Sequence, residues 1–587
     1  MKVKYLLAAG VAVLTLGLSS CSEDLLDIER HGAQSADNFY KTDQDAQAAV
    51  AAVYRTAWTL YSTNHGEMFL IKNLLSDDSY CGGLQRNDQS LYENINEYTF
   101  ESSNKYLLSY FQIFYNIVYN CNLIINNFGD SADSQIKKNA VAQAKVWRAW
   151  SYMELITLWG RVPLVDHPLE VNEYQQGNGD PEQLWGLVVN DLQDAINSGA
   201  LDSKANVNDK VATVTTGFAQ ALLGKSYVYM TYSLAGGING GQDAINAVSA
   251  AKTSPYWKNA VEALDKVINS NLYALYQGPF KDIYNSVSDW NSENIFEWNR
   301  IYNSSNTSTN LSTAFESYMI GWDNANMTGY GDILPCNRAS NFLTPRRELY
   351  DAMVAWQGAE NPRTLGSVVS YEQAVNLMGC GVLMGPHTMY AVDGVFDMKF
   401  FRDEHNDCIT SHATDKNYPL MRYAEVLLLA AEANLMAGNQ AKADQYMNEV
   451  RARVGLDPLN NVTLSDIQIE KRCELYNEGQ RRYDIIRWGL ASELMKNQGD
   501  DVPYFTAYTE SVEKDAEGKL IKLNSICEGT ITYEGETYKL GIDNRPVNES
   551  MPHGFVAGKH ELLPFPHQEY LLSGEIVGGP LVQNPGY

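Results

Sequence analysis

The chain has 587 residues, 45% of them hydrophobic and 20% charged, which is typical of a globular protein and not of a disordered or membrane-embedded one. Its formal net charge of −27 disfavours nucleic acid and strongly anionic polymers as partners, because like charges repel at long range. The eight cysteines include no CxxC pair, so most are expected to be small buried hydrophobes and not a disulfide framework or metal site.

The N-terminus predicts export and lipidation. Two early lysines precede an apolar stretch from Tyr5 to Leu18, and small residues then lead to Cys21. This pattern resembles the lipobox of bacterial lipoproteins, in which the signal is cut before the cysteine and the cysteine is acylated. We expect a signal peptide at residues 1–20, lipidation at Cys21 and a membrane tether over residues 21–40. An ordinary signal peptide that happens to end near a cysteine is the alternative.

Helical periodicity dominates the rest of the chain. Apolar residues between Gln135 and Trp159 recur at helical spacing, and Gly160 supplies a stop. Asp180 and Pro181 form an N-cap and a first helical residue for another amphipathic helix. Further helices are expected at residues 45–60, 106–126, 215–234, 256–270, 418–437, 440–454 and 465–496.

Small and aromatic residues lie close together on several of these helices, as with Ala149 and Tyr152. Such packing is typical of tetratricopeptide-like helix pairs, although the spacing between copies is irregular. Polar segments at 236–247, 303–313 and 324–331 are expected to be long loops. Residues 530–533 and 537–540 flank a Glu-Gly-Glu turn and predict a β-hairpin.

The sequence therefore predicts an all-α fold of tetratricopeptide-like helix pairs, with loop-rich decoration and a small β-hairpin near the C-terminus. We expect one domain at residues 41–587. Its N-terminal helical part would cover about residues 41–280, and its loop-rich and C-terminal helical part about residues 281–587.

Four segments carry motifs that are weak singly and specific together. They are Ala144–Tyr152 with its continuation Leu158–Val165, Tyr418–Ala433, Arg472–Trp488, and Leu563–Pro566 with the terminal Gln583-Asn584-Pro585-Gly586-Tyr587. In this order they resemble the SusD-like (RagB/SusD) family of outer-membrane glycan-binding lipoproteins. The resemblance extends from about residue 45 to the end of the chain.

The resemblance implies a lipid-anchored outer-membrane protein that captures an oligosaccharide and delivers it to a SusC-like TonB-dependent transporter. It implies no bond breaking and no cofactor. The acidic residues Ser22-Glu23-Asp24 are similar to the family's surface-export signal, so we expect the protein to face the cell exterior. A solvated acidic linker on a periplasmic protein is the alternative. A surface glycoside hydrolase, a scaffold that binds only protein, and a family member that captures peptides or another nutrient also stay open.

The Arg472–Trp488 motif places carboxylates three or four residues from arginines. These spacings predict an intrahelical ion network with Tyr483 and Trp488 packed beneath it. A carboxylate pair for acid–base chemistry is disfavoured, because the arginines would keep the carboxylates ionised. Arg422 and Glu425 have the same structural interpretation. The expected pairs are Glu478 with Arg481 and Arg482, and Asp484 with Arg487.

Enzyme motifs are incomplete in this sequence. Gly224-Lys225-Ser226 ends like a P-loop, but Ala219 replaces the required glycine and the segment has helical periodicity. There is no HExxH or GxSxG motif. The nine histidines, among them His387, His405 and His412, show no metal-ligand spacing. We expect neither an enzyme nor a metal site, although a glycosidase pair could be drawn from the many carboxylates.

A glycan site needs aromatic rings for stacking on sugar C–H faces, flanked by polar groups for the hydroxyls. Two segments offer this combination, the polar loop at 77–88 and the loops from 288 to 331, where Trp298 is expected in the core. The ligand is expected to be a neutral or weakly charged oligosaccharide. This chemistry, and not the family motifs, predicts the ligand-binding residues Trp290, Trp322, Tyr80, Asp77, Asp78, Arg86 and Asn87.

Overall fold

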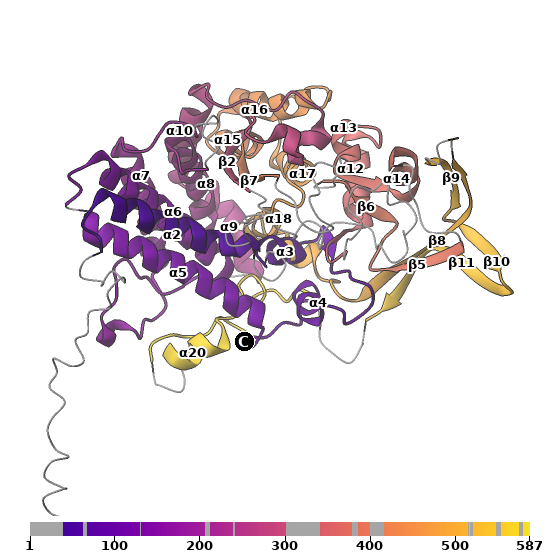
Figure 1. Ribbon diagram of the computed structural model, residues 1–587, viewed down its shortest axis with the longest axis horizontal. Coiled ribbons are helices and arrows are strands. Elements are labelled where there is room, and N and C mark those ends of the chain that lie inside the picture. The colour runs from indigo at the N-terminus through magenta and orange to yellow at the C-terminus, as the bar shows by residue number, and fades with distance from the viewer. Residues whose placement is uncertain are drawn as a thin grey trace, which may run out of the picture.

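The computed structural model is predominantly helical, with a small twisted sheet at one end (Figure 1). It describes residues 39–62, 67–129, 131–205, 212–238, 241–300, 341–378, 385–399, 416–514, 516, 520–547, 553–573 and 579–587. The predicted helical class is confirmed. One apolar core includes side chains from Ala46 to Leu581 and so draws on both expected parts of the chain. The single-domain division itself stays a prediction.

The helices of the N-terminal half pack each on the next, as expected for helix pairs. Asp180 caps its helix by accepting a hydrogen bond from the backbone N–H of Gln183 at 3.0 Å, with Pro181 at the first helical position. Gly160 ends the preceding helix at a φ of 73°, a backbone conformation that favours glycine. These helices are α2 (Asp43–Ser62), α5 (Lys105–Phe128), α6 (Gln135–Trp159), α7 (Pro181–Asn197), α8 (Thr216–Leu234) and α10 (Tyr256–Asn269).

Gly224 lies in the middle of α8, which confirms that the P-loop-like segment is helical. A Cβ at this position would come within 2.5 Å of Leu264 on α10, so glycine allows the two helices to approach closely. The neighbouring Lys225 is buried and forms an ion pair with Glu425 at 2.7 Å. Lys225 is therefore part of the core and is not placed to hold a phosphate.

The remaining helices lie mostly in the C-terminal half. The short 3-10 helices are η2 (Val171–Glu173), η3 (Phe280–Tyr284) and η4 (Ser286–Ser288). The α-helices are α3 (Glu67–Leu74), α4 (Ser90–Asn96), α9 (Gly241–Ala251), α12 (Arg347–Gln357), α13 (Pro362–Leu365), α14 (Tyr371–Met378), α15 (Tyr423–Met436), α16 (Gln440–Arg453), α17 (Leu464–Glu474), α18 (Arg481–Arg487), α19 (Ala491–Leu494) and α20 (His567–Ser573).

Three of the expected elements are wrong in part. The helix predicted at 418–437 begins only at Tyr423, because Tyr418–Arg422 forms strand β7 against β2 (Asn294–Trp298). The helix predicted at 465–496 is interrupted after Glu474, where Asn477 and Gly479 adopt positive φ values of 59° and 75°. The loop predicted at 236–247 contains the start of α9.

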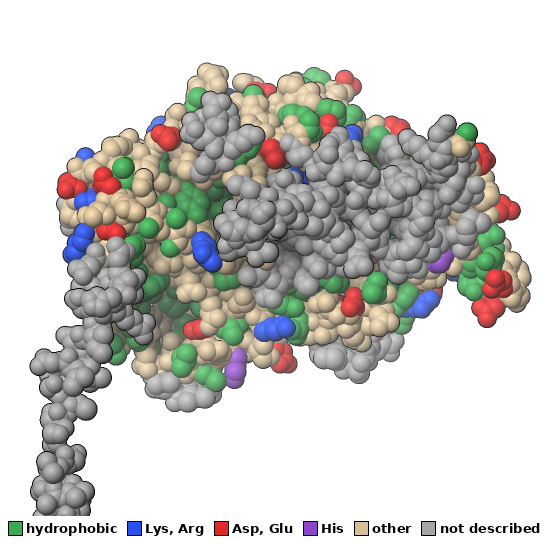
Figure 2. Space-filling view, viewed as in Figure 1, with side chains coloured by type: hydrophobic (Ala, Val, Ile, Leu, Met, Phe, Trp, Pro, Cys, Tyr) green, Lys and Arg blue, Asp and Glu red, His purple; other side chains and the backbone are tan. Residues whose placement is uncertain are grey.

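The predicted β-hairpin is confirmed but belongs to a larger sheet. Strands β10 (Gly529–Tyr533) and β11 (Glu536–Pro546) are antiparallel and joined at Glu534 and Gly535. Both turn residues have positive φ, as a two-residue hairpin turn requires. The sheet order is β10-β11-β8-β5, in which β8 is Asp501–Lys514 and β5 is Gly385–Tyr390. Strand β9 (Leu520–Ile526) also pairs with β8. Figure 2 shows acidic side chains at the free end of the hairpin.

Three two-stranded pairs complete the described strands. One of them, β2–β7, holds Trp298 in the core, where its ring stacks on Trp147 at a centroid distance of 5.3 Å. The expectation that Trp298 is a core residue is therefore confirmed. The other two pairs are β1 (Ser79–Tyr80) with β3 (Thr344–Pro345), and β4 (Val368–Ser370) with β6 (Val395–Asp397).

The described cysteines behave as the composition predicts. Cys81, Cys121 and Cys473 are buried with free thiols, and Cys527 is half-buried and also free. Cys21 lies outside the described residues. No helix among those residues is long and apolar enough to cross a membrane.

A buried cluster of charged side chains, which we call the Glu474 cluster, joins the C-terminal helices to one another. Arg422 bonds Glu474 at 3.1 Å and Glu478 at 2.6 Å, and Arg453 bonds Glu474 at 2.5 Å. Burial opposes ionisation of Glu474, but the surrounding arginines outweigh it and hold the pKa of that carboxyl well below its usual range. The other members are Glu293, Arg363, Lys399, Arg451 and Glu470.

The ion network predicted within one helix is mostly wrong. Only the Asp484–Arg487 pair forms as predicted, at 2.8 Å. Because the chain turns between Glu474 and Arg481, Arg481 reaches Asp77 at 2.7 Å and Arg482 donates to backbone carbonyls. The carboxylates are satisfied by arginines from other elements, which still gives them a structural role.

We expect Arg422→Ala to lower the free energy of unfolding by about 3–5 kcal/mol, because it removes a buried cation that Glu293, Glu474 and Glu478 share. Urea denaturation followed by circular dichroism measures the change. Lys496→Ala is the control, since the Lys496–Glu493 pair at 2.9 Å is largely exposed and should change stability by less than about 0.5 kcal/mol. Equal losses in the two variants would contradict a structural role for the Glu474 cluster.

Candidate functional site

A cavity of about 380 Å³ lies between the α4 region and the sheet. This volume falls within the range of pockets that bind small molecules. We call it the β8 cavity, because strand β8 supplies part of its wall. It brings together Arg86 and Asn87, which the sequence predicted, with residues that the sequence did not single out. Its lining is Arg86, Asn87, Asn94, Glu97, Thr99, Tyr390, Val502, Tyr504, Arg545, Pro546, Val547 and His553.

Two carboxylates from the α4 region fix the Arg86–Asn87 corner of the cavity. Arg86 donates to Glu97 at 2.9 Å, and the backbone N–H of Asn87 donates to Glu93 at 2.9 Å. Asn87 has a positive φ of 67°, which asparagine tolerates better than most residues. The hydrogen bonds to Glu97 raise the pKa of Arg86, so its charge is permanent. The corner is preorganised and carries more negative than positive charge.

Two tyrosines from the sheet also line the cavity. Tyr390 on β5 and Tyr504 on β8 are direct partners in the sheet, and their rings meet at a centroid distance of 5.4 Å. Tyr390 is buried and its hydroxyl faces Glu93 at 3.5 Å, whereas Tyr504 is half-buried. Burial, with Glu93 nearby, raises the pKa of Tyr390, so it stays a neutral hydrogen-bond donor. Tyr504 is thus the aromatic ring best placed to meet a ligand.

The structure corrects the placement of Asp77 and Asp78. They were expected on a polar loop, but they are only 6% and 2% exposed. Asp77 bonds Arg481 at 2.7 Å, and Asp78 bonds Arg472 at 2.7 Å. Burial opposes ionisation of Asp77, but the two arginines hold its pKa well below the usual range. Both carboxylates are occupied within the protein, so they are left out of the proposed site.

Tyr80 lies behind the cavity wall and does not line it. Its ring is half-buried in a small apolar cluster with Tyr390 and Tyr504, and the Arg346 guanidinium lies 3.9 Å from its centroid. Burial, opposed by Arg346, raises the pKa of Tyr80 to about 12. Tyr80 therefore supports the cavity wall from behind.

Trp290 lies elsewhere, and Trp322 lies outside the described residues. Trp290 is half-buried, and its backbone N–H donates to Glu297 at 2.7 Å. The cavity beside it, shared with Lys204, has a volume of about 20 Å³, enough for a water molecule and too small for a sugar ring. No lining residue is common to this cavity and the β8 cavity. The structure thus does not bring Trp290 together with Arg86, and ligand contact by Trp290 or Trp322 stays a prediction.

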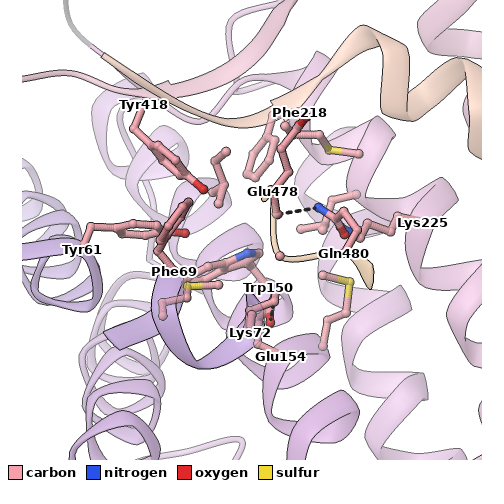
Figure 3. Close-up of a pocket in the computed structure, with 16 residues that line it drawn as sticks. Tyr61, Phe69, Lys72, Trp150, Glu154, Phe218, Lys225, Tyr418, Glu478 and Gln480 are labelled. Carbon is pink, nitrogen blue, oxygen red and sulfur yellow. Dashed lines mark hydrogen bonds and ion pairs between the residues drawn. The ribbon is translucent and has the colours of Figure 1, made fainter. Parts of the chain in front are cut away.

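A further cavity, between α3, α6 and α8, is small and lined by both apolar and charged side chains (Figure 3). Lys72 bonds Glu154 at 2.9 Å and Lys225 donates to Gln480 at 2.8 Å on its walls. Its volume of about 30 Å³ also suits water and not a sugar. Among the residues that the structure describes, no group of three or more histidine, cysteine, aspartate or glutamate side chains could hold a metal ion. The β8 cavity is therefore the strongest candidate site.

Two sequence models of protein families match the chain. One, described as the SusD family, matches residues 295–587. The other, described as starch-binding associating with outer membrane, matches residues 26–222. The chain belongs to the SusD-like family. This confirms the resemblance carried by the four motifs.

Similar proteins agree with this assignment. A SusD-like protein of Bacteroides ovatus is 24% identical over 561 residues, which cover 92% of each chain. The starch-binding protein SusD of Bacteroides thetaiotaomicron is 36% identical over 101 residues, or 17% of this chain and 18% of that one.

Solved structures share the SusD-like fold. A laminarin binding SusD-like protein aligns with a TM-score of 0.67 at 24% identity, over 93% of this chain and all of that one. Surface glycan-binding protein A from Bacteroides thetaiotaomicron, in complex with laminarihexaose, aligns with a TM-score of 0.66 at 20% identity and the same coverage.

Most residues that line the β8 cavity were not predicted from the sequence. Tyr504 and Tyr390 lie on strands far apart in the chain, and neither strand was predicted. Arg545 lies on β11 beyond the segment predicted for the hairpin. The enrichment of Asp501–Lys514 in valine, tyrosine, phenylalanine and threonine is the signal that could have found β8.

We expect Arg86→Ala to lower the free energy of unfolding by about 1.5–3 kcal/mol, because Glu97 loses a charged hydrogen-bond donor and Glu93 loses an ion-pair partner. Arg545→Ala is the matched control on the other wall of the cavity. Its ion pair with Asp543, at 2.8 Å, is exposed, so removing it should change stability by less than about 0.5 kcal/mol. Chemical denaturation measures the free energy of unfolding of both variants. An Arg86→Ala variant as stable as the control would show that the corner is not preorganised.

Proposed function

We propose that this chain is a surface lipoprotein that binds an oligosaccharide in the β8 cavity, without cleaving it, and delivers it to a SusC-like TonB-dependent transporter. The observation that carries the proposal is a ligand-sized cavity, in a SusD-like chain, with a half-buried tyrosine opposite an arginine and amides. Two solved relatives of the same fold are named for laminarin or contain laminarihexaose, which supports a glycan as the ligand.

The lining suits the chemistry of a sugar. The Tyr504 ring offers a face for C–H groups, while Asn94 and Asn87 offer amide donors and acceptors for hydroxyls. Arg86 is already held by Glu93 and Glu97, so the cavity offers little uncompensated positive charge. A neutral or weakly charged glycan therefore fits better than a sulfated or highly anionic one.

The same geometry favours binding over hydrolysis. A glycosidase places two carboxyl groups on either side of the bond to be broken, with different pKa values. Glu97 lines the β8 cavity, and both Glu97 and Glu93, which does not line it, bind the Arg86 guanidinium. Burial raises the pKa of Glu93 despite Arg86, but its carboxylate accepts hydrogen bonds from the Asn87 backbone. Neither group is free to act on a substrate.

Location and partner follow from the sequence and the family. The lipobox before Cys21 supports a lipid anchor, and the description of the N-terminal family model supports the outer membrane. Acidic residues after Cys21 support an orientation toward the cell exterior. Delivery to a SusC-like transporter rests on membership of the SusD-like family.

Calorimetric screening of the mature chain against neutral and acidic polysaccharides tests the glycan. We expect binding of a neutral oligosaccharide, and no new reducing ends on prolonged incubation. Tyr504→Ala should weaken binding about tenfold or more, because the stacking contact and its buried area are both lost. New reducing ends in proportion to added protein would instead identify a hydrolase, and binding of peptides alone would identify another nutrient.

The tryptophan predictions are tested in the same titrations. Trp290→Ala and Trp322→Ala are each expected to weaken binding about tenfold if their rings form the platform, with little loss of melting temperature. Loss of binding in Tyr504→Ala alone would place the ligand in the β8 cavity. Loss in Trp290→Ala with unchanged affinity in Tyr504→Ala would move the site to residues 288–298.

Cys21→Ala tests the anchor. We expect this variant to leave the outer-membrane fraction, because the acyl chains that hold it have no attachment site. Cell fractionation under high salt, followed by immunoblotting, measures the distribution. A variant that fractionates with the membrane as the wild type does would show that acylation is not the anchor.

A further inference from the structure

The one ring available to a sugar in the β8 cavity is covered by an arginine. The Arg545 guanidinium lies 3.9 Å from the centroid of the Tyr504 ring, which is the separation of a close cation–π contact. Both residues line the cavity. A sugar that stacks on Tyr504 needs a ring face at the same separation, so it competes with Arg545 for space.

Side chains on both neighbouring strands flank the Tyr504 ring. Strand β8 lies between β5 and β11, with Tyr390 directly opposite Tyr504 on β5 and Asp543 directly opposite it on β11. Tyr390 meets the Tyr504 ring at an interplanar angle of 64°. Arg545, two residues along β11 from Asp543, occupies the diagonal position on the same face of the sheet. Ligand access to the ring therefore depends on Arg545.

Arg545 is held weakly, unlike the other arginines near the cavity. Its ion pair with Asp543, at 2.8 Å, joins side chains that are 52% and 54% exposed, and such pairs contribute little stability. By contrast, Arg86 is bound by two carboxylates, and Arg346 over Tyr80 also donates to the backbone of Ser79. Arg545 is thus the guanidinium of this region that can move at small cost.

We propose that Arg545 is a gate on the stacking platform. In the free protein it covers the Tyr504 ring, and it is displaced when the face of a neutral sugar stacks there. This inference rests on the proposed glycan function and adds a residue that sets the affinity for neutral sugars. A neutral sugar gains no ion pair from Arg545, so binding works against the existing contact. An acidic sugar would instead gain a guanidinium partner.

The strength of the gate sets the expected effect. A binding site that is open only part of the time shows an affinity reduced by the open fraction. An exposed cation–π contact is strong enough to reduce the apparent affinity for the ligand by about two- to fivefold. Arg545→Ala should therefore bind a neutral oligosaccharide about two- to fivefold more tightly than the wild type.

The test is calorimetric titration of the mature chain with laminarihexaose, and with the other neutral hexasaccharides of the screen if that probe gives no heat. The variants are Arg545→Ala, Tyr504→Ala and the control Lys539→Ala, which removes a positive charge from β11 outside the cavity. Tighter binding in Arg545→Ala alone, with loss in Tyr504→Ala, supports the gate. Equal tightening in Lys539→Ala would assign the effect to net charge and overturn it.

Other outcomes separate the gate from the proposed function. Weaker binding in Arg545→Ala would show that the guanidinium is a ligand contact, which overturns the gate and keeps the glycan site. Unchanged affinity in Arg545→Ala overturns the gate as well. A wild-type chain that binds none of the neutral glycans overturns both the proposed function and the gate.

Discussion

The Glu474 cluster is the constraint on which the rest of the structure depends. Its buried carboxylates need arginines from several elements, and the sharp turn after Glu474 places Glu478 beside the same Arg422 that binds Glu474. The same turn directs Arg481 toward Asp77, while Arg472 reaches Asp78. Because Asp77 and Asp78 directly precede strand β1 and the loop to Arg86, the buried charges also fix one wall of the β8 cavity.

The lining of the β8 cavity suits recognition of a glycan. Its one lining carboxylate, Glu97, is committed to Arg86, and its remaining polar groups are amides, hydroxyls, a histidine and an exposed arginine. These groups are suited to many weak contacts with hydroxyls around one aromatic ring. Affinity from such contacts accumulates over several sugar units, so oligomers should be preferred to monosaccharides. This fits a protein that captures glycan fragments for transport.

Local signals made the helices predictable, and tertiary pairing made the site unpredictable. Helix α6 begins and ends where the sequence placed it, because its periodicity and the Gly160 stop are both local. The arginine partners of Asp77 and Asp78 lie about 400 residues away, so nothing near them in sequence showed that they are buried. Arg86 and Asn87, which line the cavity, were predicted from the local chemistry of a polar loop, whereas Tyr504 depends on a strand whose partners are distant in the chain. Two of the family motifs, Tyr418–Ala433 and Arg472–Trp488, contain buried charged residues of the fold.

A crystal structure of the mature chain with a neutral oligosaccharide tests the central claim most directly. The account predicts a sugar ring stacked on Tyr504, with hydroxyls within hydrogen-bond distance of Asn94 or Arg86 and no cleaved linkage. A sugar bound beside Trp290, or anywhere outside the β8 cavity while that cavity holds only solvent, would contradict it.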